Sequence, residues 1–379
     1  MHRVLAISLL RKLVCAGVLS LSLAIPMFPI HTVAQSSAEN GQKMAATPSF
    51  QLIVRVSPGA SYETEASLTD KKMLKELEDA VPGDPYDGAL PPDVTLSYEK
   101  AGRNLSYGVT PEGEVVDLTR KLKLNLSSRV QELLAGQVQA LRAQHYGEIL
   151  PWEQASEVLP KYSKFTIIDV ESGLSFEGQR RAGSSHADVQ PLTKQDSATL
   201  KKIYGGAWSW DRKAVLVRLD GRTLAGSMHG MPHGGDGIPG NDFNGHFCIH
   251  FLGSVTHGSR SFDPAHQVMV HRAAGLLTAY ISKLTPWALI DVWISAANQG
   301  DLQLLQVTTG QEQAVHMRTM RRLSKFQERD TSQLLELDTA VDVTATPEGS
   351  NAAKTRRVLF HLERGSVTSR WYIRSAVIQ

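Results

Sequence analysis

A segment in the middle of the chain brings histidines and a cysteine together. Eight of the 13 histidines fall within residues 186–271, and four of these lie within residues 229–250. Cys248 belongs to the same segment, in the run Gly-His-Phe-Cys-Ile-His at residues 245–250. A cysteine thiolate is a strong nucleophile, and a neighbouring imidazole can remove the thiol proton. Glycine before the cysteine lets backbone N–H groups point at a carbonyl oxygen. The segment therefore indicates acyl transfer through Cys248.

Two histidines before the cysteine are candidates for its base. His229 precedes Cys248 by 19 residues and His233 precedes it by 15. Loop geometry rather than spacing decides which ring reaches the sulfur, so His229 is the first candidate and His233 the alternative. His250 lies two residues after Cys248, which on a strand places it on the same face. It could contact substrate or serve as a structural histidine.

A second polar cluster follows a predicted strand, in the run Gly-Ser-Ser-His-Ala-Asp at residues 183–188. Its His186 and Asp188 could line a substrate groove. The alternative is a loop in which Asp188 only accepts hydrogen bonds from nearby backbone. Both interpretations stay open at this point.

The first 34 residues are typical of an export signal. Basic residues up to Lys12 precede an apolar run at residues 13–30, and Thr-Val-Ala at 32–34 is a small-residue cleavage site. The alternative is an uncleaved membrane anchor, although two prolines interrupt the apolar run. Cleavage would remove Cys15 and leave Cys248 as the only thiol, which cannot form an internal disulfide. We therefore expect a secreted protein.

The charge balance argues against a nucleic-acid partner. Residues 1–34 contain three basic residues and no acidic one, so 37 basic residues (40 minus 3) face 38 acidic residues in the rest of the chain. Binding to nucleic acid relies on a basic surface, and no basic stripe is present. A membrane would be a partner only if the N-terminal segment stays uncleaved.

The histidine and cysteine spacing resembles the L,D-transpeptidases of the YkuD type. That family carries a histidine, then 14 to 17 residues, then Ser/Thr-His-Gly-Cys. Here 15 residues separate His229 from Gly245, which opens Gly-His-Phe-Cys. The resemblance covers roughly residues 162–284. The motif departs from the family in Gly245 for the hydroxyl residue, Phe247 for the glycine and His250 for the usual Arg or Asn.

The resemblance implies a role for each matched residue. Cys248 would be the nucleophile and His229 its base, with the carbonyl of Gly230 orienting the His229 ring. His246 would support the site, and the amides of Phe247 and Cys248 would form the oxyanion hole. The thiolate would attack the carbonyl of the third residue of a peptidoglycan stem peptide and expel the terminal D-alanine. An amine or water would resolve the thioester, with no metal or cofactor needed.

Two other function classes use the same residues. A zinc-dependent cell-wall hydrolase is one alternative, because histidines and carboxylates are zinc ligands. A peptidoglycan-binding module without catalysis is the other, and Phe247 in the place of the glycine is the feature that favours it. The candidate zinc ligands are His229, His233, His246, His250, Asp188 and Asp236.

The elements predict a multi-domain α+β protein. After a flexible linker at residues 35–49, residues 50–150 predict a small α+β domain. Residues 161–285 predict a mostly β domain like that of the L,D-transpeptidases, and residues 286–379 predict helices followed by a curved sheet. That last part resembles the cone-shaped nuclear-transport-factor-2-like domains in architecture alone. The predicted strands are 50–56, 94–98, 104–109, 165–170, 174–180, 214–219, 222–227, 357–363 and 368–377. The predicted helices are 70–81, 126–146, 263–283, 287–297 and 313–329.

Several connections are also predicted. Strands 94–98 and 104–109 are expected to pair, and Asp220-Gly221 is expected to join 214–219 to 222–227 as a tight hairpin. Asp263 fits the cap of the helix 263–283 and Pro264 its first turn. Cys248 is expected where a loop enters a strand.

Overall fold

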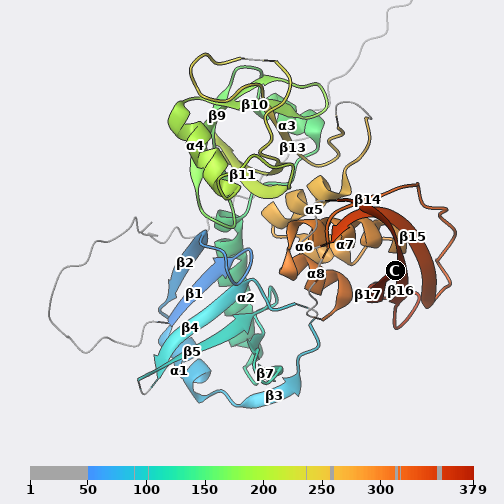
Figure 1. Ribbon diagram of the computed structural model, residues 1–379. Coiled ribbons are helices and arrows are strands. Elements are labelled where there is room, and N and C mark those ends of the chain that lie inside the picture. The colour runs from blue at the N-terminus through green and yellow to red at the C-terminus, as the bar shows by residue number, and fades with distance from the viewer. Residues whose placement is uncertain are drawn as a thin grey trace, which may run out of the picture. The chain divides into compact units, whose positions relative to one another are not determined.

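The computed structural model describes residues 50–88, 90–100, 102–235, 237–256, 260–311, 315, 317–347 and 352–379. The predicted export signal, the linker and Asp236 lie outside these residues. The described residues form a mixed α and β structure, mostly β, with three sheets and several helices (Figure 1). This confirms the predicted α+β class. None of the described helices is long and apolar enough to cross a membrane.

The first sheet has the strand order β2-β1-β4-β5-β6-β7-β3. The predicted pairing of the strands near 94–98 and 104–109 is confirmed, since β4 and β5 pair antiparallel along their whole length. Ser127 caps the start of the helix predicted after residue 126, because its hydroxyl accepts a hydrogen bond from the Val130 amide. The elements are β1 (Phe50–Arg55), β2 (Glu63–Leu68), α1 (Lys71–Asp79), β3 (Pro82–Pro85), β4 (Val94–Lys100), β5 (Arg103–Val109), β6 (Val115–Asp117), β7 (Leu122–Leu124) and α2 (Ser128–His145).

The second sheet closes into a barrel with the strand order β10-β13-β12-β11-β8-β9. Asp220 and Gly221 connect β11 to β12 and have φ values of 49° and 76°, as a tight hairpin turn requires. The predicted hairpin at this dipeptide is therefore confirmed. The elements are α3 (Trp152–Val158), β8 (Lys164–Asp169), β9 (Ser175–Ala182), β10 (Ala187–Pro191), α4 (Lys194–Ile203), β11 (Lys213–Leu219), β12 (Arg222–Met228) and β13 (Phe247–His250).

The helix predicted for residues 263–283 is interrupted. Asp263 caps its start and Pro264 occupies the first turn, as predicted, but α5 (Pro264–Ala273) ends before Gly275 and α6 (Leu277–Ile281) follows. Gly275 has a φ of 68°, and a Cβ there would lie 2.6 Å from the Tyr146 ring. The close approach of Tyr146, which comes from a distant part of the sequence, accompanies the break.

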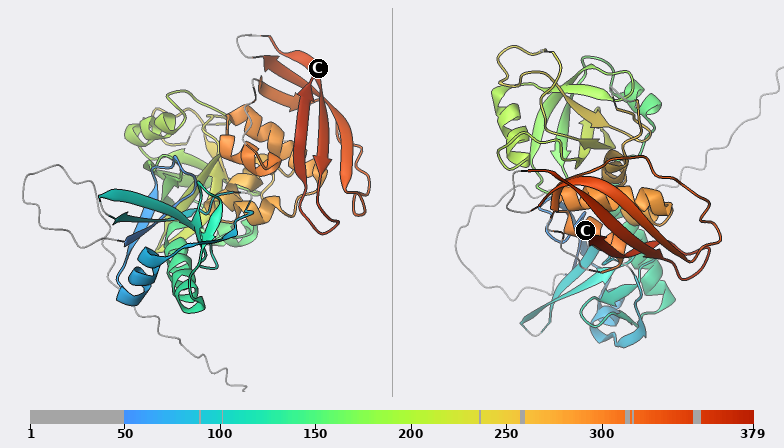
Figure 2. Two further views of the ribbon diagram at one scale, coloured as in Figure 1. Left: turned by 90° about the horizontal axis from the view of Figure 1, so that it is seen from below. Right: turned by 45° about the vertical axis from the view of Figure 1, so that its right-hand side comes forward.

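The third sheet has the strand order β14-β15-β16-β17. Figure 2 shows these strands as a curved sheet with α7 (Pro286–Gln299) and α8 (Leu302–Thr309) along one face. The helix predicted for residues 313–329 is wrong, because β14 (Met317–Arg322) lies within that range. It pairs with β15 (Glu336–Pro347), a strand that the sequence pattern did not predict. The remaining strands are β16 (Lys354–Glu363) and β17 (Tyr372–Ile378).

A buried ion pair joins α5 to the start of α8. The Arg272 guanidinium donates to both carboxylate oxygens of Asp301, at 2.6 and 3.0 Å. Asp301 also caps α8 by accepting a hydrogen bond from the Leu304 amide. Burial alone would raise the pKa of Asp301, but the charge and hydrogen bonds of Arg272 outweigh it and hold that pKa below its ordinary value. Asp301 therefore stabilises the fold in its ionised form.

Replacing Asp301 by alanine should lower the free energy of unfolding by about 3–5 kcal/mol, because it leaves a buried guanidinium without its main partner. Urea unfolding at neutral pH would measure this. Asp342→Ala is the matched control, since its partner Arg357 is exposed and the change should be small. The contribution of Asp301 is present above about pH 4 and is lost as the pH falls through its lowered pKa. Equal losses in the two variants at neutral pH would contradict this assignment.

Candidate active site

Strand β13 carries Cys248 between β10 and β12. Cys248 lies opposite Asp188 of β10, and the next residues of β13 pair with the end of β12. Successive side chains of a strand point to opposite faces. Phe247 and Ile249 pack into the barrel core, so Cys248 lies on the other face. Cys248 is the second residue of β13 and thus lies where a loop enters a strand, as predicted.

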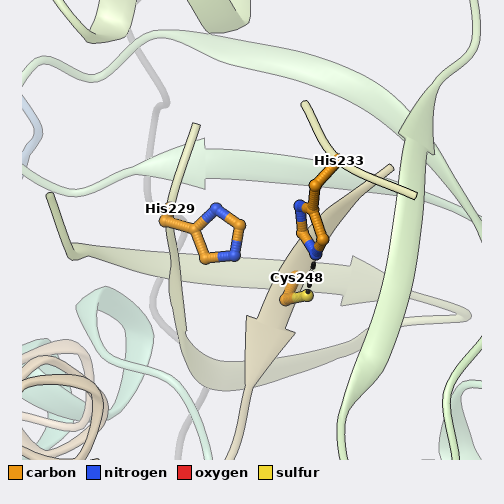
Figure 3. Close-up of side chains that lie close together, drawn as sticks. All are labelled: His229, His233 and Cys248. Carbon is orange, nitrogen blue, oxygen red and sulfur yellow. Dashed lines mark hydrogen bonds between the residues drawn. The ribbon is translucent and has the colours of Figure 1, made fainter. Parts of the chain in front are cut away.

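His233 is the histidine in contact with the sulfur. Its Nε2 lies 3.4 Å from Cys248 Sγ, as Figure 3 shows. Its Nδ1 lies 3.0 Å from the carbonyl oxygen of Met231. A carbonyl can only accept a hydrogen bond, so Nδ1 carries the proton of the neutral ring and Nε2 presents a lone pair to the thiol. His233 thus has the tautomer that a base for Cys248 needs.

The backbone of the His233 loop is tied directly to the segment before Cys248. His233 and His246 exchange two backbone hydrogen bonds, with N–O distances of 3.0 and 2.8 Å. Gly245 has a φ of 110°, and a Cβ there would lie 2.3 Å from the carbonyl oxygen of His233. Glycine at position 245 therefore permits the close approach that places the His233 ring over the sulfur.

His229, the first candidate for the base, lies beside this pair. Its ring is 5.1 Å from that of His233 and 4.6 Å from that of Trp210, between ring centroids. Burial, followed by the charge of His233, lowers the pKa of His229 well below its ordinary value, so this ring is neutral. Its side chain is 4% exposed. In Figure 3 its ring lies beside the His233 ring, near the sulfur.

The carbonyl of Gly230 does not orient the His229 ring as the resemblance implied. The Nδ1 of His229 is buried and has no hydrogen-bond partner among the described residues. Gly230 instead donates its amide to the carbonyl of Ser209, and a Cβ at Gly230 would lie 2.4 Å from the Tyr204 ring. The orienting carbonyl in the structure is that of Met231, acting on His233. No side-chain pattern marks a backbone carbonyl, so the sequence carried no signal for it.

Asp188 places a carboxylate beside the thiol. Its Oδ1 lies 3.9 Å from Cys248 Sγ, 3.2 Å from His186 Nε2 and 3.7 Å from His246 Nε2. Burial, and then the charge and hydrogen bond of Asp188, raise the pKa of Cys248 well above its ordinary value. Cys248 is therefore a protonated thiol at rest, and its proton must leave as it reacts. The predicted polar cluster at His186 and Asp188 is thus brought to the cysteine, across the β10–β13 pair.

Only one of the two amides predicted for the oxyanion hole faces the histidines. Alternate residues of a strand direct their N–H groups to the same neighbour. The backbone N–H of His246 donates to the carbonyl of His233. The N–H of Cys248 therefore points to the same side of β13, past Met228, where β12 ends. The amide of Phe247 points to β10, where Phe247 lies opposite Val189. Phe247 is therefore not placed for the oxyanion role.

The Phe247 side chain lies inside the barrel, away from the sulfur. It is fully buried, and its ring centroid is 5.9 Å from those of both Phe176 and Phe243. An aromatic residue at this position is therefore a core residue that leaves the cysteine face of β13 unobstructed.

Three further histidines near the site, His186, His250 and His266, stack on one another. The His250 ring is stacked between His186, at 4.6 Å, and His266 of α5, at 3.7 Å. His266 is anchored by the Ser227 hydroxyl, 2.8 Å from its Nδ1. These contacts give His250 a packed environment. The sequence predictions did not include His266 in the site, because only the packing of α5 on the barrel brings it there.

Two groups of side chains in the described part of the chain have the spacing of a metal site. The ligand atoms of His229, His233 and Cys248 lie within 4.8 Å of one another, and so do those of His186, Asp188 and Cys248. Of the zinc ligands predicted from sequence, His246 and His250 belong to neither group.

Comparison with protein-family models, curated proteins and solved structures returned no match for this chain. The arrangement of Cys248, His233 and Met231 is therefore the basis on which the function is inferred.

Proposed function

We propose that this chain is an exported cysteine acyltransferase of the L,D-transpeptidase type that acts on peptidoglycan stem peptides. The observation that carries the proposal is the chain of contacts from Cys248 Sγ to His233 Nε2 at 3.4 Å, and from His233 Nδ1 to the Met231 carbonyl at 3.0 Å. A nucleophile next to a base that is itself oriented by a third group is the arrangement that covalent catalysis requires.

The geometry supports a two-step reaction. As the sulfur of Cys248 attacks the substrate carbonyl carbon, its proton moves to Nε2 of His233, and a C–S bond forms. The tetrahedral intermediate then breaks its C–N bond, and His233 returns the proton to the departing amine. In the second step an acceptor amine or water attacks the carbonyl carbon of the thioester and the C–S bond breaks. The proton of the acceptor passes through the His233 ring to the departing sulfur, which restores the Cys248 thiol. The backbone N–H of Cys248 points to the side of β13 on which His233 lies and can donate to the developing oxyanion.

The proposal assigns the base to His233 rather than His229. A proton acceptor must lie within hydrogen-bond reach of the proton that it removes. His233 meets that condition, and its Nδ1 is fixed by a carbonyl. His229 makes no hydrogen bond in the described structure and fits a different role, which is argued below.

The finer layout belongs to the same proposal. The barrel of β8 to β13 would be the L,D-transpeptidase-like domain, and α7 to β17 would be a cone-like domain of the nuclear-transport-factor-2-like kind. The N-terminal segment would export the protein to the cell wall or envelope. The chemistry of Cys248 and His233 needs no cofactor.

A carbapenem should acylate Cys248 once per chain. The strained lactam is an acyl donor whose ring opens on attack, so intact-mass spectrometry of the chain lacking residues 1–34 should show a gain of one whole carbapenem molecule. Cys248→Ala should show no gain. A thiol that forms no adduct and also resists small alkylating agents in the folded protein would contradict the proposal.

A further inference from the structure

His229 is a buried histidine that the proposed reaction leaves without a task. It is 4% exposed, and neither ring nitrogen makes a hydrogen bond among the described residues. A buried polar group without a partner is uncommon in folded proteins. Figure 3 shows its ring directed toward the sulfur of Cys248, beside the ring of His233. The unpartnered ring therefore points into the cluster that contains the thiol.

The ligand atoms of His229, His233 and Cys248 have separations close to those of ligands around one bound metal ion. For a tetrahedral zinc ion, bond lengths of about 2.3 Å to sulfur and about 2.05 Å to nitrogen place sulfur and nitrogen about 3.6 Å apart. Cys248 Sγ and His233 Nε2 are 3.4 Å apart. The ligand atom of His229 lies within 4.8 Å of both, so a small rotation of its side chain would complete a three-ligand site.

The surroundings of these ligands also suit a metal. The Nδ1 of His233 is hydrogen-bonded to the Met231 carbonyl, which leaves Nε2 as the ligand, and such partners are typical of metal-bound histidines. Trp210 packs against both imidazoles, with centroids 4.6 and 5.2 Å away.

The second group around the sulfur is a poorer candidate. His186 Nε2 already lies 3.2 Å from the Asp188 carboxylate, and His186 Nδ1 lies 2.8 Å from the Val255 carbonyl. Both ring nitrogens of His186 thus already have an oxygen atom nearby, whereas His229 makes no hydrogen bond to the described residues. The observations favour the group that contains His229.

We propose that His229, His233 and Cys248 form a binding site for a divalent transition metal ion of the zinc type, and that the bound ion blocks acylation of Cys248. Imidazole and thiolate are ligands that zinc prefers, and three protein ligands leave a fourth position for water. Binding forms a metal–sulfur bond and releases the thiol proton to solvent. The ion occupies the lone pairs of both the nucleophile and its base. The blocking of acylation rests on the proposed function, but the binding does not.

Cobalt is the probe for this site. Metal-depleted protein lacking residues 1–34 would be titrated with Co²⁺, and absorption spectra should show a thiolate-to-cobalt charge-transfer band that saturates at one ion per chain. Zn²⁺ should displace the cobalt and abolish the band. Bound cobalt without that band, or no binding, would overturn the proposal.

Variants separate the ligands from other histidines. His229→Ala should weaken Co²⁺ binding at least about 10-fold, because even the loss of a group that only orients a ligand costs about 10- to 100-fold. His361→Ala, at a half-buried histidine of β16 in the third sheet, is the matched control and should bind like the unaltered chain. Cys248→Ser should lose the charge-transfer band while keeping the side-chain size. Circular dichroism would verify folding of each variant, and unchanged binding in folded His229→Ala would overturn the assignment.

The outcomes also separate this inference from the proposed function. Metal binding without carbapenem acylation would leave the site standing and reject the acyltransferase. Acylation without metal binding would reject the metal site and support the acyltransferase. If both occur, saturating Zn²⁺ should suppress the carbapenem adduct in the unaltered chain and should have little effect on its formation in His229→Ala. Acylation of the unaltered chain that proceeds unchanged at saturating Zn²⁺ would reject the blocking.

Discussion

Replacing His233 by alanine should slow the acylation of Cys248 by about 10²- to 10⁴-fold, the usual contribution of a positioned general base. Burial and the Asp188 carboxylate keep the Cys248 thiol protonated, so little thiolate exists without a proton acceptor. The His233 Nε2 lies 3.4 Å from the sulfur and is the ring nitrogen placed to take that proton. The rate of carbapenem adduct formation, followed by mass spectrometry in the presence of a chelator, would measure the loss.

His229→Ala is the matched control for this experiment. The His229 side chain lies against the same tryptophan, and one of its ring nitrogens is within 4.8 Å of the sulfur, but it has no contact that orients it as a base. We expect its acylation rate to stay within a few-fold of that of the unaltered chain. The opposite ranking, with a large loss in His229→Ala and a small one in His233→Ala, would return the base to His229.

Gly245→Ala should lower the acylation rate by about 10²-fold although position 245 bears no reacting atom. Its φ of 110° is unfavourable for alanine, and the added Cβ would lie 2.3 Å from the carbonyl oxygen of His233. The His233 loop must therefore move away from β13, and a displacement of about 1 Å between reacting groups can cost about 10²-fold in rate. The same adduct assay would measure this loss.

Gly235→Ala provides a control in the same loop. A Cβ at Gly235 has no atom within 4 Å, and its φ does not fall in the left-handed region. This variant should react at a rate close to that of the unaltered chain. If both glycine variants reacted normally, the contact between residues 233 and 246 would not be what positions the base.

Local chemistry in the sequence determined many of the elements. Asp220-Gly221 accepts the positive φ values of a tight turn, so the β11–β12 hairpin is predictable from two residues. Asp263 and Pro264 start α5 because a carboxylate caps free amides and proline lacks the amide that would need a cap. The gathering of histidines around Cys248 also identified the region of the candidate site. In each case the deciding interaction lies within a few residues of the chain.

Contacts between distant residues decided the rest. The sequence could not rank His233 above His229, because the ranking depends on the backbone bridge from His233 to His246. It could not place Asp188 beside Cys248, since that placement comes from the register of β10 on β13. The strand β14 was predicted as a helix because its pairing partners in β15 lie far along the chain, as in Met317 with Pro347 and Arg322 with Val343. Spacing and residue type report on neighbours within a turn or a strand, whereas strand pairing and loop packing bring together residues whose separation the sequence does not encode locally. For that reason the sequence identified the candidate nucleophile and the histidines around it, and the tertiary structure decided which of them meet.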